Sequence, residues 1–433
     1  MKHKIMMIAA LLCLVAAVTR AQEGAWSGEL DIQGIKLPLV FHFNPDGCTM
    51  DSPSQGAKGI KAEKCITEDG KLKVTVAECG VTFEGYMWKN SIIGTFSQNG
   101  LSLPLTIKPG MPKVNRPQTP VAPFPYTTGE VSFKNGTFTL CGTLTLPQSY
   151  SKNTPVVLMV TGSGQQNRDE ECFDHKPFAV IADALARQGI ASLRYDDRGY
   201  NDPSVKFTDF ITDDFKDDAA AGIAFLRNRF KTVGVLGHSE GGTIALMLAG
   251  EGKPDFIVSM AGMAVSGKET LLSQNRTALR SMGLSDDAVN DYCKVISDVF
   301  DKVAAGMNID EVLQGYDDSS SLKPLISQAK QTFSVPYMRH LITVDVRKSL
   351  PNIKCPVLAV NGKLDMQVDY EANLGALEKG LVNARHETVA FDSLNHLFQH
   401  CTTGSVVEYQ QIEETMSKDV LDKIASWINS LEQ

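Results

Sequence analysis

The spacing of hydrophobic and polar residues divides the chain into two parts with different predicted secondary structure. Over residues 22–108, short segments alternate apolar and polar positions, and turn-forming pairs such as Asp46-Gly47 and Asn99-Gly100 separate them. This pattern predicts short strands joined by tight turns, which favours a small antiparallel sheet or a partial barrel. The predicted strands are 30–32, 37–43, 72–76, 81–86, 92–96 and 103–107.

A proline-rich segment follows at residues 109–125, and its six prolines are typical of an extended, semi-rigid linker. Beyond it, over residues 126–433, the pattern changes. A hairpin is predicted around Asn135-Gly136, and strand-like segments then alternate with helical ones, which predicts an α/β fold with a doubly wound, mostly parallel sheet. The strand-like segments after the hairpin are 156–160, 191–195, 233–236, 256–260, 356–360 and 386–391.

Residues 264–349 interrupt this alternation with polar, helix-like sequence. We interpret them as a helical insertion, which in such an architecture usually covers the active site. The sequence therefore predicts a β-rich domain, a linker, and a larger α/β domain that carries a helical cap.

Residues 1–21 have the pattern of a secretory signal peptide: Lys2 and Lys4, an apolar run over 5–18, and a small residue at Ala21. The run is shorter than the ~20 residues that span a bilayer, which disfavours a membrane anchor. A lipid anchor at Cys13 is a further alternative, which the bulky Leu12 disfavours. We expect an exported protein without a membrane segment after cleavage.

Composition narrows the range of partners. Hydrophobic residues make up 43% and charged residues 21%, as in ordinary globular proteins. Removal of Lys2, Lys4 and Arg20 from the 42 basic residues leaves 39 against 50 acidic ones, a net charge of −11. This balance disfavours nucleic acid and anionic membranes as partners. No signal in the sequence indicates a particular oligomeric state.

Eight cysteines remain after residue 21, an even number that permits disulfides in an exported chain. Buried free thiols are the interpretation we prefer. No Cys-x-x-Cys pair is present, so no structural zinc site is expected.

The strongest chemical signal is Gly237-His238-Ser239-Glu240-Gly241, which joins the apolar segment 233–236 directly to a predicted helix. A strand that turns at once into a helix holds the residue at the apex in strained backbone angles, and only glycine fits where the neighbouring chains pass closely. Ser239 would thereby be lifted above the sheet as a nucleophile. A plain strand–helix turn is the alternative.

A serine nucleophile needs a base and an acid, which follow it in the order acid, then histidine, in this type of fold. His396 lies just beyond the last predicted strand, at the edge where such sheets place their sites. We favour it over the other downstream histidines, His340, His386 and His400. Asp365 follows the strand-like segment 356–360, and we favour it as the acid over Asp369 and Asp392.

Two backbone N–H groups should stabilise the oxyanion. One is expected from Glu240, directly after the nucleophile, and the other from the loop 161–166, where we favour Ser163 over Gly164 or Gln165.

Asp196-Asp197-Arg198 ends another predicted strand at the same edge. We assign this group a structural role.

Five motifs occur in an order that resembles the EstD-like bacterial carboxylesterases of the α/β-hydrolase fold: 162–164, 195–199, 237–241, 362–368 and 394–399. The resemblance extends from about Trp26 to Trp427. It implies Ser239, Asp365 and His396 as nucleophile, acid and base, hydrolysis of short-chain esters, and a periplasmic location. Thr161 departs from the family pattern, in which many members have histidine, and this difference concerns the shape of the oxyanion loop.

We therefore predict a serine hydrolase that acts on small-molecule esters and needs no metal or organic cofactor. One alternative is a serine peptidase or aminoacyl amidase on the same fold. Another is a carbohydrate-binding or assembly protein with a vestigial hydrolase domain. Trp26, Tyr86 and Trp88 could form a sugar platform in that case, although packing in the core is the role we expect for each.

Overall fold

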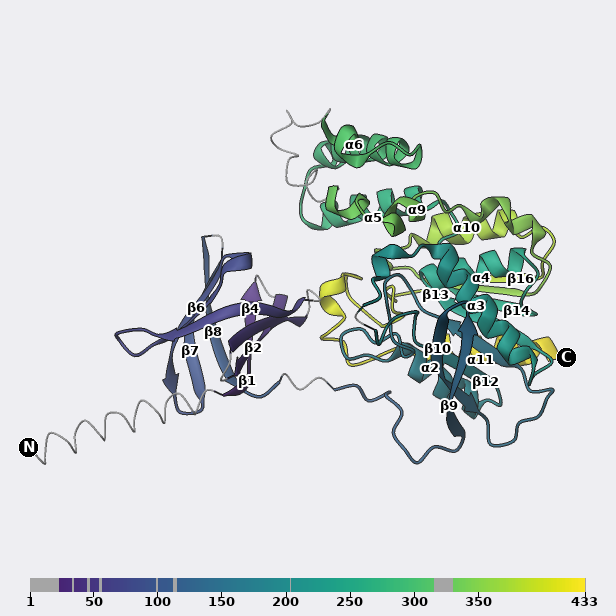
Figure 1. Ribbon diagram of the computed structural model, residues 1–433, viewed down its shortest axis with the longest axis horizontal. Coiled ribbons are helices and arrows are strands. Elements are labelled where there is room, and N and C mark those ends of the chain that lie inside the picture. The colour runs from purple at the N-terminus through teal and green to yellow at the C-terminus, as the bar shows by residue number, and fades with distance from the viewer. Residues whose placement is uncertain are drawn as a thin grey trace, which may run out of the picture. The chain divides into compact units, whose positions relative to one another are not determined.

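The computed structural model describes residues 23–32, 35–44, 47–53, 57–98, 100–111, 115–202, 204–314 and 330–432 (Figure 1). The contacts divide the chain into two compact units. One comprises the residues up to Asn115 together with Val406–Glu413, and the other comprises Arg116–Ser405 and Glu414–Gln433. The predicted signal peptide, residues 1–21, lies outside the described residues.

The first unit contains a closed antiparallel barrel in which each strand pairs with the next and β1 also pairs with β8. Inward-facing residues such as Trp26, Phe41 and Phe83 fill it, each at most 2% exposed. The strands are β1 (Gly24–Ile32), β2 (Ile35–Asn44), β3 (Gly47–Ser52), β4 (Ala57–Ile66), β5 (Leu72–Val76), β6 (Val81–Trp88), β7 (Ser91–Gln98) and β8 (Leu101–Pro109).

The structure confirms the N-terminal antiparallel β domain but corrects two details. The barrel is closed rather than partial, because β3 and β4 complete it and the sequence pattern did not reveal them. The β4 strand is largely exposed and rich in lysine, so it lacks an apolar alternation. Trp26 is buried as expected, but Tyr86 and Trp88 are 54% and 59% exposed on β6, so these two do not pack in the core.

The second unit is built on an eight-stranded sheet in the order β16-β15-β14-β13-β11-β12-β10-β9. Its strands are parallel except for the β9–β10 hairpin, which pairs antiparallel with β12. The predicted doubly wound, mostly parallel sheet is confirmed. The strands are β9 (Thr127–Asn135), β10 (Phe138–Leu146), β11 (Val156–Val160), β12 (Ala191–Tyr195), β13 (Val233–His238), β14 (Phe256–Met260), β15 (Val357–Gly362) and β16 (His386–Phe391).

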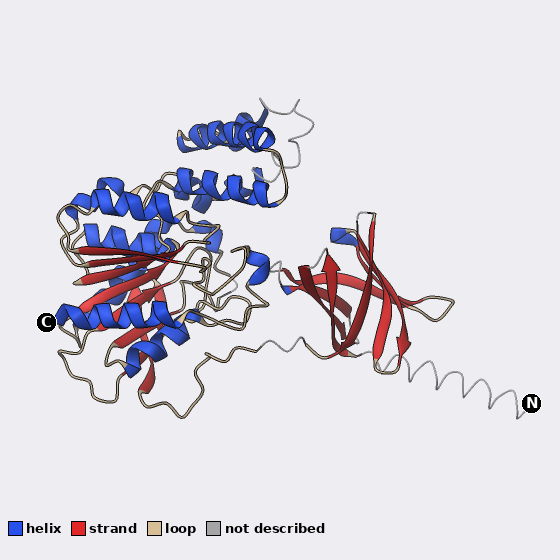
Figure 2. Ribbon diagram, turned by 180° about the vertical axis from the view of Figure 1, so that it is seen from behind, coloured by secondary structure: helices blue, strands red, loops and turns tan. Residues whose placement is uncertain are grey.

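Helices cover both faces of this sheet (Figure 2). On one face α3 (Thr212–Arg227), α4 (Glu240–Gly250) and α10 (Tyr370–Gly380) share a core with alternate strand residues such as Leu158 and Val235. On the other face α2 (Pro177–Arg187) and α11 (Lys418–Asn429) pack on the remaining strand residues, such as Val157 and Leu236. Because both faces are covered, the central strands are fully buried and largely apolar, as is typical of parallel sheets.

The helical insertion between β14 and β15 has a hydrophobic core of its own. In Figure 1, α6 lies farthest from the sheet, and α5 and α9 lie between it and the body of the domain. The helices described here are α5 (Gly267–Ser281), α6 (Asp286–Ala304), α7 (Ile309–Gln314) and α9 (Pro336–Leu341). Within the described parts of the chain, no helix has the length and apolar character needed to cross a membrane.

The eight cysteines after residue 21 all lie among the described residues, and none of them is joined in a disulfide, as preferred from the sequence. The expectation that they are buried is wrong for most of them. Cys48 and Cys293 are buried, whereas Cys65 and Cys141 are exposed and the remaining four are intermediate.

Candidate active site

The nucleophile motif forms a sharp turn between β13 and α4. Ser239 stands at its apex with φ 54° and ψ −119°, a conformation that L-residues rarely adopt. Its N–H donates to the carbonyl oxygen of Met260 at 2.8 Å, which ties the turn to the end of β14. The strained backbone is therefore held by the sheet on one side and by the start of the helix on the other.

Two glycines make this turn possible. A Cβ at Gly237 would lie 1.9 Å from the carbonyl oxygen of Gly241, and a Cβ at Gly241 would lie 2.0 Å from that of Val160. Backbone atoms cannot move away as the end of a flexible side chain can, so a larger residue would break the contact between strand and helix. The steric argument for glycine at both positions thus holds in the structure.

Asp365 and His396 come together at the carboxyl edge of the sheet, from the loops that follow β15 and β16. His396 Nδ1 lies 2.7 Å from Asp365 Oδ2, and the two side chains are 4% and 0% exposed. The other carboxylate oxygen, Oδ1, accepts the backbone N–H groups of Gln367 at 2.7 Å and Val368 at 2.9 Å. The acid is thereby fixed, and Oδ2 remains directed at the histidine.

The alternative acids and bases make other contacts. Asp369 caps α10 by accepting the N–H of Ala372, and the side chain of Asp392 is 83% exposed beside Lys363. The rival histidines pair with carboxylates elsewhere, and His386 lies at the opposite end of β16. These pairs are His340 with Asp213, His386 with Glu378 and His400 with Glu414.

His238 links the nucleophile to the histidine loop. It precedes Ser239, its ring centroid lies 4.7 Å from that of His396, and its Nε2 lies 2.9 Å from the carbonyl oxygen of His396. On the other side, a Cβ at Gly162 would lie 3.2 Å from Cβ of Ser239, so the loop after β11 passes directly beside the serine. The three loops that carry the predicted site residues therefore meet around the elbow.

The loop after β11 is held in place by buried acids. Gly162 N–H donates to Glu170 Oε1 at 2.7 Å, so this N–H already has an acceptor. The next N–H along the chain, that of Ser163, is therefore the donor that we favour for an oxyanion. The Thr161 hydroxyl donates to Asp197, and so does the N–H of Gln166 at 2.7 Å. Burial raises the pKa of Asp197 well above its usual range. Thr161 thus serves as an anchor for the loop.

Glu240 begins α4, and the first N–H groups of a helix have no acceptor within the helix, so its N–H is suited to the second oxyanion contact. Its side chain plays a part that sequence reasoning missed. It is 3% exposed and accepts hydrogen bonds from Thr212 Oγ1 at 2.7 Å and from the hydroxyl of Tyr337 on α9. The helical insertion is therefore tied to the residue that follows the nucleophile.

Glu240 should make stability depend on pH. Burial raises its pKa in the folded protein, although the hydroxyls of Tyr337, Thr212 and Ser163 oppose the shift. In the unfolded chain it titrates near the ordinary value of about 4.3. Between these two pKa values the folded state binds more protons, so the free energy of unfolding falls as pH rises. In urea unfolding across this range, wild type should lose stability relative to Glu240→Gln as pH rises. If the two free energies of unfolding differ by the same amount at every pH, the raised pKa of Glu240 is contradicted.

Asp196, Asp197 and Arg198 hold the structure around the site rather than the reacting groups. Asp196 receives two hydrogen bonds from the Arg168 guanidinium, at 3.1 and 2.7 Å. Arg198 donates to both oxygens of Asp218, at 2.7 and 2.8 Å, which fixes α3. Its guanidinium also lies over three aromatic rings, those of Phe138, Phe210 and Phe215.

An Arg198→Ala variant should be strongly destabilised. Arg198 and Asp218 have side chains only 5% and 1% exposed, so the change leaves a buried carboxylate without its cation. Loss of one partner from such a pair typically costs about 3–5 kcal/mol. Urea unfolding measures this cost. The matched control is Arg280→Ala, since the Arg280–Asp286 pair is 52% and 74% exposed and should contribute less than about 1 kcal/mol.

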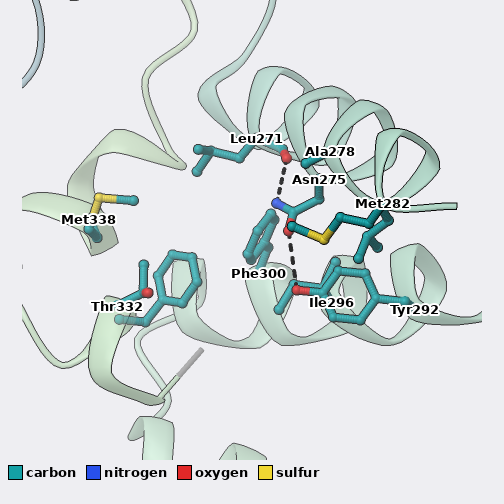
Figure 3. Close-up of a pocket in the computed structure, with 11 residues that line it drawn as sticks. Leu271, Asn275, Ala278, Met282, Tyr292, Ile296, Phe300, Thr332 and Met338 are labelled. Carbon is teal, nitrogen blue, oxygen red and sulfur yellow. Dashed lines mark hydrogen bonds between the residues drawn. The ribbon is translucent and has the colours of Figure 1, made fainter. Parts of the chain in front are cut away.

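A separate cavity of about 270 Å³ lies between α5, α6 and α9 (Figure 3). Its lining is mainly apolar, and one polar pair crosses it: the Tyr292 hydroxyl donates to Asn275 Oδ1 at 3.2 Å, and Asn275 Nδ2 donates to the carbonyl of Leu271. None of the predicted site residues lines this cavity. Within the described residues, no group of three or more His, Cys, Asp or Glu side chains is arranged to hold a metal ion.

Comparison with known proteins places these features in context. Residues 155–400 match the model of the alpha/beta hydrolase fold family. The chain is 30% identical over 295 residues to Esterase EstD of Thermotoga maritima; the match covers 67% of this chain and 65% of that protein, slightly less than two thirds of its length. Two solved structures are similar at lower levels. One is Est1E from Butyrivibrio proteoclasticus, with 13% sequence identity and a TM-score of 0.42. The other is proline iminopeptidase of Mycobacterium smegmatis, with 14% sequence identity and the same TM-score. Each comparison covers 70% of this chain and 98% of the other.

Proposed function

The chain belongs to the alpha/beta hydrolase fold family, and we propose that it is a serine carboxylesterase that hydrolyses short-chain acyl esters through an acyl-enzyme on Ser239. The observation that carries this proposal is the buried contact of 2.7 Å between His396 Nδ1 and Asp365 Oδ2, which His238 ties to the strained elbow of Ser239. The similarity to an esterase from Thermotoga maritima supports the choice of ester over other acyl substrates.

Acylation begins at Ser239. Because Asp365 accepts the Nδ1 proton of His396, Nε2 is left with a free lone pair and can take the proton of the serine hydroxyl. The serine oxygen then bonds to the ester carbonyl carbon, and the bond from that carbon to the alcohol oxygen breaks. His396 gives its proton to the departing alcohol, and Asp365 stabilises the transient imidazolium.

Deacylation uses the same groups with water in place of serine. His396 takes a proton from water, the hydroxide oxygen attacks the acyl carbon, and the bond to Ser239 breaks as the serine regains its proton. In both steps the N–H groups of Ser163 and Glu240 would stabilise the negative oxygen, together with the positive end of α4. No further chemical group is needed for this cycle.

The proposal includes export of the protein after removal of residues 1–21. The support is the sequence alone, since these residues lie outside the described structure. N-terminal sequencing of the protein recovered from its native cells tests this point. A mature chain that begins near Gln22 is expected, and a chain that retains Met1 or Lys2 would contradict it.

A panel of nitrophenyl esters tests the substrate class. We expect kcat/KM to be highest for acetyl and butyryl esters and to fall for octanoyl and dodecanoyl esters, with Ser239→Ala as the blank. Matched aminoacyl nitroanilides serve as the comparison, because peptidases on this fold use the same nucleophile. Faster turnover of the anilides than of the corresponding esters would contradict the esterase assignment and favour a peptidase.

A further inference from the structure

A second buried histidine stands beside the catalytic candidates, and the mechanism above does not use it. His238 is 6% exposed, and each of its ring nitrogens faces an acceptor. Nδ1 lies 3.0 Å from Glu170 Oε1, and Nε2 lies 2.9 Å from the backbone carbonyl oxygen of His396. The ring therefore bridges a buried carboxylate and the main chain of the predicted base.

These contacts indicate a charged imidazolium. The carbonyl of His396 can only accept, so Nε2 must carry a proton, and an ionised Glu170 carboxylate requires a second proton on Nδ1. Oε1 of Glu170 also accepts the N–H of Gly162, as an ionised oxygen does readily. Burial opposes a charge on His238, but the Glu170 carboxylate and the His396 carbonyl outweigh it, so the pKa of His238 lies above its usual value.

The same pair touches three of the segments that form the site. Glu170 binds the loop after β11 through Gly162, His238 precedes the nucleophile, and His238 also binds the loop that carries His396. Glu170 is 4% exposed and holds a positive φ of 52°, a backbone conformation that needs support from its surroundings. One ion pair thus connects three loops that come from distant parts of the chain.

We propose that Glu170 and His238 form a positioning ion pair that orients His396 and sets the pH above which His396 is available as a base. The inference rests on the proposed function, since it concerns the base of that reaction. Neither residue is assigned contact with substrate. Both act through His396 and through the oxyanion loop.

The charges around His396 determine how readily its ring takes up a second proton. Asp365 contacts its Nδ1, and His238 lies 4.7 Å away between centroids. Glu170 contacts the other ring nitrogen of His238, Nδ1, and Asp197, from the loop after β12, interacts with Glu170. With Glu170 ionised and His238 protonated, the pair is neutral as a unit. The cation is the member in contact with His396, so it disfavours a second positive charge on that ring.

A His238→Gln variant separates the charge from the hydrogen bond. Glutamine removes the positive charge but retains an N–H donor that can reach the carbonyl of His396. Glu170 then remains as an unpaired negative charge, which favours protonated His396. The acid limb of the pH profile of kcat/KM should move to higher pH by on the order of one pH unit, by Coulomb's law at this separation.

Glu170→Gln, unlike His238→Gln, should not move the limb to higher pH. If His238 loses its extra proton with the carboxylate, the local charge is unchanged and the limb stays; if it keeps the proton, the limb moves to lower pH. The double variant Glu170→Gln/His238→Gln should return close to wild type. A purely structural role predicts instead that all three variants lose rate at every pH while the limb stays at its wild-type pH.

His386 offers a matched control within the same chain. It also lies between a backbone carbonyl, that of Ala384, and a carboxylate, that of Glu378, but at the opposite end of β16. His386→Gln should leave the acid limb where it is. A shift equal to that of His238→Gln would overturn the proposal, because it would show that any histidine between a carbonyl and a carboxylate has this effect.

An NMR titration measures the protonation of His396 directly and does not depend on catalytic turnover. The Cε1–H signal of His396, assigned by its loss in His396→Gln, should titrate at higher pH in His238→Gln than in wild type. An unchanged titration of His396 would overturn the positioning role even if the esterase assignment holds. Wild-type protein without ester hydrolysis would contradict the proposed function alone. Thermal melting identifies any variant that does not fold. If His238→Gln does not fold, Glu170→Gln is the test: a limb that moves to higher pH, or a loss of rate at every pH with the limb unmoved, would overturn the proposal, and a limb that stays with the rate retained or moves to lower pH supports it.

Discussion

A Ser239→Ala variant is expected to lose kcat/KM toward short-chain esters by at least about 10⁴-fold, because the acyl-enzyme can no longer form. The remaining rate would come from the oxyanion donors and from substrate binding, which together still exceed the reaction in water. Alanine has an unfavourable φ of 54° here, as serine does, so the backbone strain is largely unchanged. Hydrolysis of nitrophenyl butyrate measures the loss.

The control for this variant is Ser281→Ala at the exposed end of α5, where the hydroxyl donates to the carbonyl of Ala278. It removes the same atom at a position without a chemical role, and we expect wild-type activity. Retention of most activity in Ser239→Ala, with correct folding by circular dichroism, would contradict the assignment of Ser239 as the nucleophile.

An Asp365→Asn variant is expected to lower kcat by about 10⁴-fold, and the structure gives the reason. Oδ1 of Asp365 accepts two backbone N–H groups, so asparagine would place its oxygen there and present its NH₂ group to His396 Nδ1. Nδ1 would then have to accept, and the ring proton would move to Nε2. A histidine with a protonated Nε2 cannot take the proton of Ser239.

Asp369→Asn is the matched control, because Asp369 was the neighbouring alternative for the acid and the structure uses it to cap α10. Asparagine caps helices as well as aspartate does, so activity should change by only a few-fold at most. A larger loss of kcat in Asp369→Asn than in Asp365→Asn would show that Asp369, rather than Asp365, is the acid. Steady-state kcat for one ester, measured on both variants, decides between them.

The elements that sequence predicted well are those in which local pattern and position agree. Strand β12 begins and ends at the predicted residues because both of its faces are buried, and an apolar run then stands out from its surroundings. Asp365 and His396 could be chosen because parallel strands bring their carboxyl ends to one edge, so the order of residues along the chain limits the candidates.

The supporting residues could not be predicted in the same way. Glu170 lies in a polar loop, and its partner His238 is 68 residues away, so no local pattern connects them. Tyr337 reaches Glu240 from a helix 97 residues further along. Strand β4 lacked an alternating pattern because its side chains are largely exposed. In each case the three-dimensional arrangement, rather than neighbouring residues, determines the role.

The most direct test of the central claim is labelling with a fluorophosphonate, followed by mass spectrometry of the peptides. A strained elbow with a base beside it should give one covalent adduct on Ser239 in the folded protein. That adduct should be absent from denatured protein, strongly reduced in His396→Ala, and slowed by an excess of ester substrate. No adduct on the folded wild-type protein, or an adduct on another serine with Ser239 unmodified, would contradict the account.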